Sequence, residues 1–110
     1  MSGRSSKAKG SGGEREVLKI LQDHGIEAHR NDQRYVGGKD NPDISASLDG
    51  IPFHVEVKRK ERFSIYEAMT QAVTDANGKA VPVVAYRRNR GQWLLIAQLD
   101  DILKLKENAP

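Results

Sequence analysis

The 110-residue sequence contains no cysteine, few aromatic residues and no long apolar run. Without cysteine the chain cannot form disulfides, thiolate zinc sites or a cysteine nucleophile, which fits a reducing, cytoplasmic compartment. No stretch approaches the roughly 20 apolar residues that a membrane span needs, and no signal peptide precedes the first expected element. Two Phe, one Trp and three Tyr supply a small core, so we expect one domain.

Positive charge is present in clusters, although the net charge is only +3. The clusters are Arg4, Lys7 and Lys9; Lys58, Arg59, Lys60 and Arg62; and Arg87, Arg88 and Arg90. A solvated surface accounts for any single cluster. Three clusters in and around expected loops favour a polyanionic partner.

The order of expected elements indicates the fold class. Residues 1–10 are polar and basic without periodicity, which predicts a flexible basic arm. A helix is expected from Ser11, where Ser11 and Glu14 fit a capping box, to Gly25. Strands are expected at 26–30, 43–48, 51–58, 81–86 and 92–97, a polar loop at 31–41, and further helices at 64–77 and 99–106. The order α-β-β-β-α-β-β-α predicts an α/β domain over residues 11–110, with a central mixed five-stranded sheet flanked by helices.

The hairpin at residues 42–58 is the most informative stretch. A two-residue turn at Asp49-Gly50 pairs residues whose numbers sum to 99, so Asp43 is expected opposite Glu56. Strand alternation places Ser45, His54 and Lys58 on the same face and leaves the other face apolar. Like charges directly opposite each other repel, and a divalent cation between them removes that penalty. The hairpin therefore predicts a metal site.

A third carboxylate is expected from the first helix. Glu14 falls close to the apolar stripe of that helix, whereas Glu16 lies about 120° away from it. The alternative is that Glu14 only completes the capping box with Ser11. Because a carboxylate on a core-facing stripe needs a partner, we expect Glu14 to share the metal site.

This constellation suits phosphodiester hydrolysis. Mg²⁺, with Mn²⁺ as a substitute, prefers all-oxygen sites, and we expect Asp43 and Glu56 as direct ligands and Glu14 as a ligand directly or through water. Lys58 is expected to orient the attacking water or to stabilise the developing phosphate charge. Its alternative role is a salt bridge with Glu56.

Two further polar residues are accessory candidates. His54 has no second ligand-like histidine nearby, so we expect it to contact DNA or lie at the surface rather than to bind metal. Gln71 lies off the apolar stripe of its helix and could approach the site, although a plain surface position is the favoured interpretation.

Three motifs together resemble the archaeal-type Holliday junction resolvases of the PD-(D/E)xK nuclease superfamily. They are Lys9-Gly-Ser-Gly-Gly-Glu14-Arg15-Glu16, Pro42-Asp43 and Glu56-Val57-Lys58. The resemblance runs from about Lys9 to Tyr86 and includes the order of elements. It implies a restriction-endonuclease-like fold and a nuclease with Glu14, Asp43 and Glu56 around Mg²⁺ and Lys58 beside the attacked phosphate. The short C-terminal part suggests a phage or prophage origin, and hence the cytoplasm of a bacterial host.

The resemblance also implies DNA contacts for Arg15 and Arg30. They join the basic residues of the clusters as candidates: Lys9, Arg59, Lys60, Arg62, Arg87, Arg88 and Arg90. The predicted function is a Mg²⁺-dependent endonuclease that resolves four-way DNA junctions by paired hydrolysis. The alternatives are another nuclease of the superfamily, with nicking, mismatch or restriction-type activity, and a non-catalytic DNA-binding module.

Two opposed cuts need two metal sites, so a homodimer is expected. The material for its interface is the helix at 64–77, with Ile65, Met69, Ala72, Val73 and Ala76, together with the strand Val81–Tyr86. The alternative is that this apolar stripe only covers the sheet.

Overall fold

The computed structural model describes residues 2–31 and 43–107, with side chains described from Gly12 onward. Asn31 is therefore the one described residue of the loop expected at 31–41, and Pro42 of the Pro-Asp motif also lies outside the described residues. The elements are α1 (Ser2–Asp23), β1 (Glu27–Arg30), β2 (Ile44–Leu48), β3 (Ile51–Arg59), α2 (Ile65–Ala76), β4 (Val81–Arg87), β5 (Leu94–Ala97) and α3 (Leu99–Glu107). The predicted order of elements is confirmed.

The five strands form one mixed sheet in the order β1-β2-β3-β4-β5. Among the described strands, β3 and β4 pair in parallel and the other neighbours pair antiparallel. The parallel pair requires a crossover, which α2 supplies between the two strands. Because β4 lies between β3 and β5, the strand expected to contribute to a dimer interface, Val81–Tyr86, has neighbours on both sides and offers no free edge to a partner.

The hairpin of β2 and β3 has the predicted register. Ile44 pairs with Val55 and Leu48 pairs with Ile51, so paired numbers sum to 99. Asp49 and Gly50 both have positive φ, 53° and 83°, as a two-residue turn of this type requires.

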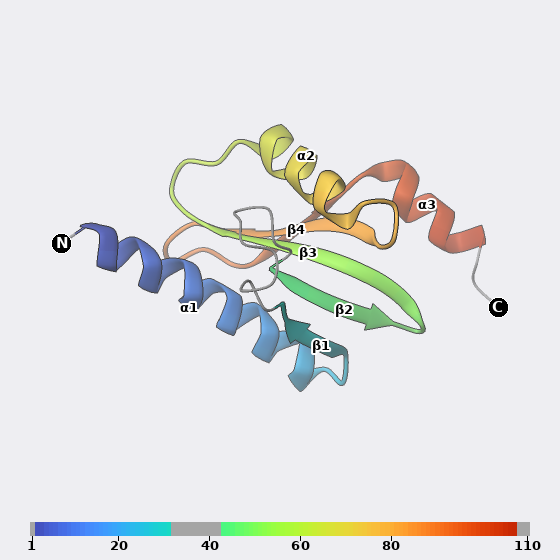
Figure 1. Cartoon of the computed structure of the whole chain (residues 1–110), viewed down its shortest axis with the longest axis horizontal. Helices are drawn as coiled ribbons and strands as arrows, with labels where there is room; N and C mark the ends of the chain where they lie inside the picture. Colours follow the sequence, from blue (N-terminus) through green and yellow to red (C-terminus); the bar gives the residue numbers. More distant parts are fainter. Residues whose placement is uncertain (1, 32–42, 108–110) are drawn as a thin grey trace.

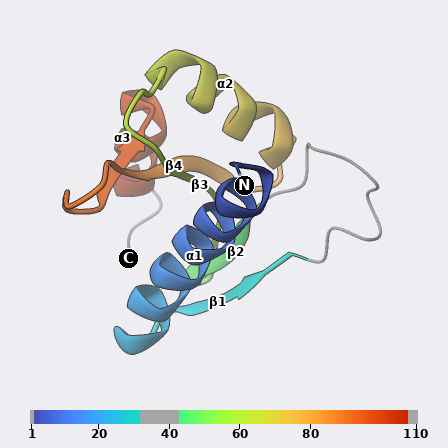
Figure 2. The same cartoon turned by 90° about the vertical axis from the view of Figure 1, so that its left-hand side faces the viewer.

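Two cores lie on opposite faces of the sheet, because alternate residues of each strand point to opposite sides. The α1 face buries Val17, Ile44, Val55, Val83 and Ala85, and the α2 face buries Ala68, Met69, Ala72 and Val84. Figure 1 shows the sheet between the two helices. The view turned by 90° shows α2 above β3 and β4, and α1 below these two strands (Figure 2).

The first helix differs from expectation at its start. It begins at Ser2 rather than Ser11, so residues expected to form a flexible arm are helical. The glycines before Glu14, which were interpreted as part of a helix start, lie inside the helix where it approaches the sheet. A Cβ on Gly13 would lie 3.4 Å from side-chain atoms of Val57 and Arg59 and 3.5 Å from Trp93. A residue without a side chain therefore allows a close approach of α1 to β3.

The second helix has the predicted limits but not the predicted cap. Ser64 is the N-cap residue of α2, yet its side chain makes no capping hydrogen bond. The helix ends at Ala76, and its C-cap residue Asn77 adopts the left-handed conformation with φ 51°. No helix within residues 2–31 and 43–107 combines the length and apolar character that crossing a membrane requires.

Candidate active site

Asp43 and Glu56 come together at the junction of β2 and β3. Asp43 directly precedes β2, and continuing the register of the hairpin by one residue places it beside Glu56 in the middle of β3. The Asp43 carboxylate accepts a 2.6 Å hydrogen bond from the backbone N–H of Val57. Glu56 is 1% exposed. Two carboxylates thus share a largely enclosed site.

The electrostatics of Asp43 reflect this enclosure. The pKa of Asp43 is raised from 3.8 to about 7, chiefly by burial and then by the charges of Glu56 and Glu14, against the lowering effects of the Val57 N–H and the Lys58 ammonium. Negative charge is therefore in excess at this site near neutral pH. A bound divalent cation would relieve that excess, and oxygen donors from carboxylates fit a hard cation such as Mg²⁺.

Glu14 approaches the pair from α1. Its carboxylate accepts a 2.9 Å hydrogen bond from Nε of Arg30, and its side chain is 15% exposed. The charge of Glu14 raises the pKa of Asp43, so the two carboxylates lie within electrostatic reach of each other. Among the described residues, the acidic and histidine side chains whose ligand atoms all lie within 4.8 Å of one another are His54, Glu56 and Asp75. That Asp43, Glu56 and Glu14 share one cation therefore stays a prediction, supported by the effect of both other charges on Asp43.

Lys58 and Gln71 meet at the edge of the same site. The Lys58 ammonium donates a 3.1 Å hydrogen bond to the side-chain oxygen of Gln71 on α2. The expectation that Gln71 is plain surface is therefore wrong. Its side chain contacts Lys58, as the alternative interpretation had it. Lys58 also lowers the pKa of Asp43, whereas the alternative salt bridge to Glu56 is not among the ion pairs of the described residues.

His54 is buried, which corrects the expectation of a DNA or surface contact. It is 3% exposed, and its Nε2 lies 2.9 Å from Oε2 of Glu56. The sequence interpretation treated the polar face of the hairpin as open, but α2 covers it. A carboxylate oxygen of Asp75 on α2 completes a group with His54 and Glu56 in which the ligand atoms lie within 4.8 Å of one another. The available signal was the helical spacing, since Asp75 follows Gln71 by one turn.

Glu16 binds a different set of partners from Glu14. Arg87 donates to both oxygens of Glu16 from Nε at 3.0 Å and Nη2 at 3.1 Å, and Arg59 donates from Nη1 at 3.2 Å. The indole N–H of Trp93 donates a further bond of 3.0 Å, and the Arg87 guanidinium lies 5.4 Å from the Trp93 ring centroid. The hydrogen bond from Arg87 is the largest of the effects that lower the pKa of Glu16. Sequence reasoning gave Glu16 no partner, because this cluster joins positions 43 to 77 residues apart.

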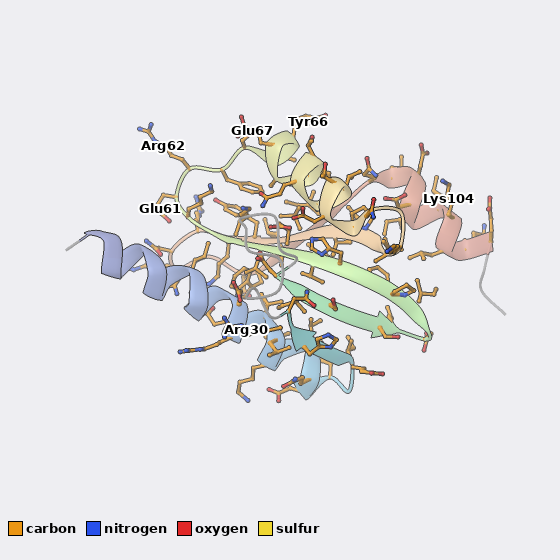
Figure 3. All side chains as sticks on the ribbon, viewed as in Figure 1. Arg30, Glu61, Arg62, Tyr66, Glu67 and Lys104 are labelled. Atoms are coloured by element: carbon orange, nitrogen blue, oxygen red, sulfur yellow. The ribbon has the colours of Figure 1, made fainter. Side chains whose placement is uncertain are left out.

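The structure separates the predicted DNA-binding residues into two groups. Arg30, Arg59 and Arg87 are engaged by Glu14 or Glu16. The side chains expected to contact DNA that remain exposed without such an ion pair among the described residues are Arg15, Lys60, Arg62, Arg88 and Arg90. Figure 3 shows Arg62 projecting away from the sheet on the segment between β3 and α2, and Arg30 beside α1. The side chain of Lys9 lies outside the described residues.

Comparisons with known proteins find a nuclease family and a similar solved structure. A family model described as "Phage putative PDDEXK endonuclease" matches residues 5–109. The solved structure of Hjc from Archaeoglobus fulgidus, a Holliday junction resolvase from an archaeal hyperthermophile, is similar with a TM-score of 0.59 and 28% identity. The match covers 76% of this chain and 72% of that one. A search of the curated proteins finds no match.

Proposed function

The chain belongs to the family of phage putative PDDEXK endonucleases and is a nuclease, and we propose that it resolves four-way DNA junctions by Mg²⁺-dependent paired hydrolysis. The observation that carries the proposal is the likeness, in fold and in 28% of matched residues, to the Archaeoglobus fulgidus resolvase. The enclosed carboxylates beside Lys58 supply the chemistry that hydrolysis of a phosphodiester needs.

In the proposed site, Asp43 and Glu56 hold the cation directly and Glu14 holds it directly or through water. When bound, Mg²⁺, or Mn²⁺ in its place, supplies stabilisation of the negative charge that develops on the attacked phosphate. Lys58 donates hydrogen bonds to the attacking water or to a phosphate oxygen, and Gln71 restrains the ammonium for this task. The closed environment strengthens each of these interactions, because the surroundings screen charge poorly.

Binding to DNA comes from the exposed basic residues. Arg15 lies on α1 next to Glu14, Lys60 and Arg62 follow β3, and Arg88 and Arg90 follow β4. Phosphate contacts of this kind position a duplex without reading its sequence. A preference for junctions then comes from the placement of two active sites.

We propose a homodimer to supply those two sites. The outer side of α2 faces solvent with Ile65 and Val73, and it borders a groove of about 500 Å³ that Ile96 of β5 and Leu99 of α3 also line. Of the interface residues expected from the sequence, Met69, Ala72 and Ala76 are instead buried against the sheet. The proposed interface therefore consists of the exposed flank of α2 with β5 and α3. A phage-encoded enzyme of this type would act in the cytoplasm of its bacterial host.

The test is cleavage of three end-labelled substrates of equal length: a four-way junction, a fork and a linear duplex, each with Mg²⁺ and with a chelator. We expect cuts in the junction in symmetric pairs, little cleavage of the linear duplex and none without the cation. The Glu56→Gln variant controls for contaminating nuclease. Equal cleavage of junction and duplex by the wild type would contradict junction resolution and would favour a nuclease of the nicking or mismatch type. Cleavage that persists in the chelator would contradict the cation requirement.

A further inference from the structure

The buried face of β3 carries His54, Glu56 and Lys58 in succession, and α2 packs over this face. Each end of this polar row has a counterpart on α2. Gln71 accepts a hydrogen bond from Lys58, and Asp75, one helical turn later, lies within 4.8 Å of the ligand atoms of His54 and Glu56. The helix α2, which contributes no proposed metal ligand, therefore packs directly over these three side chains.

The contact between His54 and Glu56 joins Nε2 to Oε2 over 2.9 Å. A carboxylate that binds a cation is ionised and only accepts hydrogen bonds, so in that state Nε2 of His54 is the donor. This bond uses one oxygen of Glu56 and leaves Oε1 for other partners. Because the side chains of His54 and Glu56 are only 4% and 2% exposed, water has little access to replace the bond.

A buried carboxylate that loses its donor does not keep its position without cost. Residues that hydrogen-bond to metal ligands set the orientation of those ligands, and their replacement costs about 10- to 100-fold in metal affinity or activity. Lys58 and Gln71 stand in a comparable relation at the other end of the row. The hydrogen bond from His54 can restrain the orientation of the Glu56 carboxylate.

We propose that His54 is a positioning residue, which holds the Glu56 carboxylate in the orientation that binds a divalent cation. Asp75 on α2 has a carboxylate oxygen within 4.8 Å of the ligand atoms of both residues. This inference rests on the proposed function only in that Glu56 is taken as a ligand of the cation. His54 itself binds neither the cation nor DNA. It acts through the carboxylate, and its loss changes metal affinity more than it changes DNA affinity.

The experiment compares two variants that differ by one methylene, His54→Gln and His54→Asn. The amide nitrogen of Gln reaches the position of Nε2 and can still donate to Glu56, whereas that of Asn reaches only the position of Nδ1. Binding of Mn²⁺ to the protein without DNA is measured by titration calorimetry, and DNA affinity is measured separately in Ca²⁺. We expect His54→Asn to weaken Mn²⁺ binding about 10- to 100-fold, and His54→Gln to stay close to wild type. DNA affinity stays unchanged in both variants.

Met69→Ala is the control for a general loss of packing, because Met69 is buried in the core on the same face of the sheet and has no hydrogen-bond donor to offer Glu56. It should lower thermal stability and leave Mn²⁺ affinity unchanged. If His54→Asn does not fold, Asp75→Asn takes its place, and we expect a weaker loss of Mn²⁺ affinity in the same direction.

Each remaining outcome separates the two proposals. Equal Mn²⁺ affinity in wild type, His54→Asn and Asp75→Asn, with binding abolished in Glu56→Gln, overturns the role of His54 and leaves the proposed function standing. Unchanged binding in Glu56→Gln overturns the metal site itself. A Zn²⁺ site in the wild type that both His54 variants lose would make His54 a ligand and would overturn the positioning role.

Discussion

The carboxylates of Asp43 and Glu56 repel each other in an enclosed site, and this makes the stability of the protein depend on pH. The pKa of Asp43 is raised to about 7, chiefly by burial, whereas the unfolded chain has the ordinary value of 3.8. The folded protein therefore holds a proton that the unfolded chain has released between these two values. The contribution of Asp43 to the free energy of unfolding is full below about pH 4 and is lost as the pH rises to about 7.

Urea unfolding in a chelator measures this effect. We expect the wild type to lose stability between about pH 4 and pH 7 relative to Asp43→Asn, which has no proton to release at this position. Mg²⁺ should stabilise the wild type more at about pH 8 than at about pH 6, because at the lower pH the cation competes with the proton on Asp43. Identical dependence of stability on pH in the two proteins would mean that folding does not raise the pKa of Asp43.

The two acidic residues of α1 provide a matched pair for testing the catalytic assignment. We expect Glu14→Gln, like Asp43→Asn, Glu56→Gln and Lys58→Ala, to lower the cleavage rate by about 100-fold or more and to leave DNA binding largely intact. Glu16→Gln should cleave, because Glu16 is turned toward Arg59, Arg87 and Trp93. Single-turnover cleavage and gel-shift affinity are the two measurements. Loss of cleavage in Glu16→Gln with activity in Glu14→Gln would reverse the assignment.

Among the secondary-structure elements, α1 is attached through Glu16 to the part of the sheet formed by β3, β4 and the segment before β5. The carboxylate joins the helix to β3 through Arg59, to the end of β4 through Arg87, and to Trp93 before β5. Gly13 allows the same helix turn to lie against Val57 and Trp93.

The anchor has a pH dependence of the opposite sign. Hydrogen bonding to Arg87 lowers the pKa of Glu16 below its usual 4.5, so its contribution is present above that value and is lost as the pH falls. The Glu16 side chain is 38% exposed, and we expect Glu16→Gln to cost only about 1 kcal/mol near neutral pH and less near pH 3. Asp23→Asn, which removes the exposed pair of Lys19 and Asp23, should cost close to nothing in the same urea titrations. Equal effects of both substitutions would argue against an anchor.

The end of β4 and the connection to β5 carry arginines with different expected roles: Arg87 is bound to Glu16, whereas Arg88 and Arg90 are exposed. Replacing Arg88 and Arg90 with Gln should weaken binding to all DNA shapes and reduce the slope of log affinity against log salt by roughly one unit for each lost phosphate contact. Arg87→Gln should instead lower stability and change the salt slope little, because Arg87 is bound to Glu16 and lies over Trp93. Affinity measured across a salt series decides this. An unchanged slope in the Arg88 and Arg90 variant would mean that this loop faces away from DNA.

Local rules predicted the parts of the molecule that depend on neighbours in the chain. The Asp49-Gly50 turn defined the register of β2 and β3, and periodicity defined the limits of α2 to within a residue or two. The parts that were missed depend on contacts between distant segments. His54 could not be recognised as buried until α2 was placed over β3, and Glu16 had no visible partner until β4 and Trp93 were brought to α1. The early start of α1 was missed because glycines were interpreted as breakers where they serve close packing.

For the assembled enzyme, the exposed flank of α2 decides between a monomer and the proposed homodimer. Ile65 and Val73 are 50% and 40% exposed on a helix whose other side is already buried, and Tyr66 beside them is 86% exposed. Apolar residues gathered along a groove are typical of a surface that binds a partner. A two-fold axis through this surface would relate two active sites, as paired cuts in opposed strands of a junction require.

We therefore expect a homodimer in sedimentation equilibrium, and expect Val73→Glu to convert it to a folded monomer. The monomer should still bind DNA, since its basic residues are unchanged, but it should nick junctions in one strand instead of cutting in symmetric pairs. Ile20→Glu is the matched control, because Ile20 on α1 is 43% exposed and lies on the opposite side of the sheet from α2. If Val73→Glu and Ile20→Glu both leave the mass and the paired cuts unchanged, the flank of α2 is not the interface. If the wild type is a monomer both free and on a junction, the two cuts must come from successive encounters, and the resolvase proposal loses its physical basis.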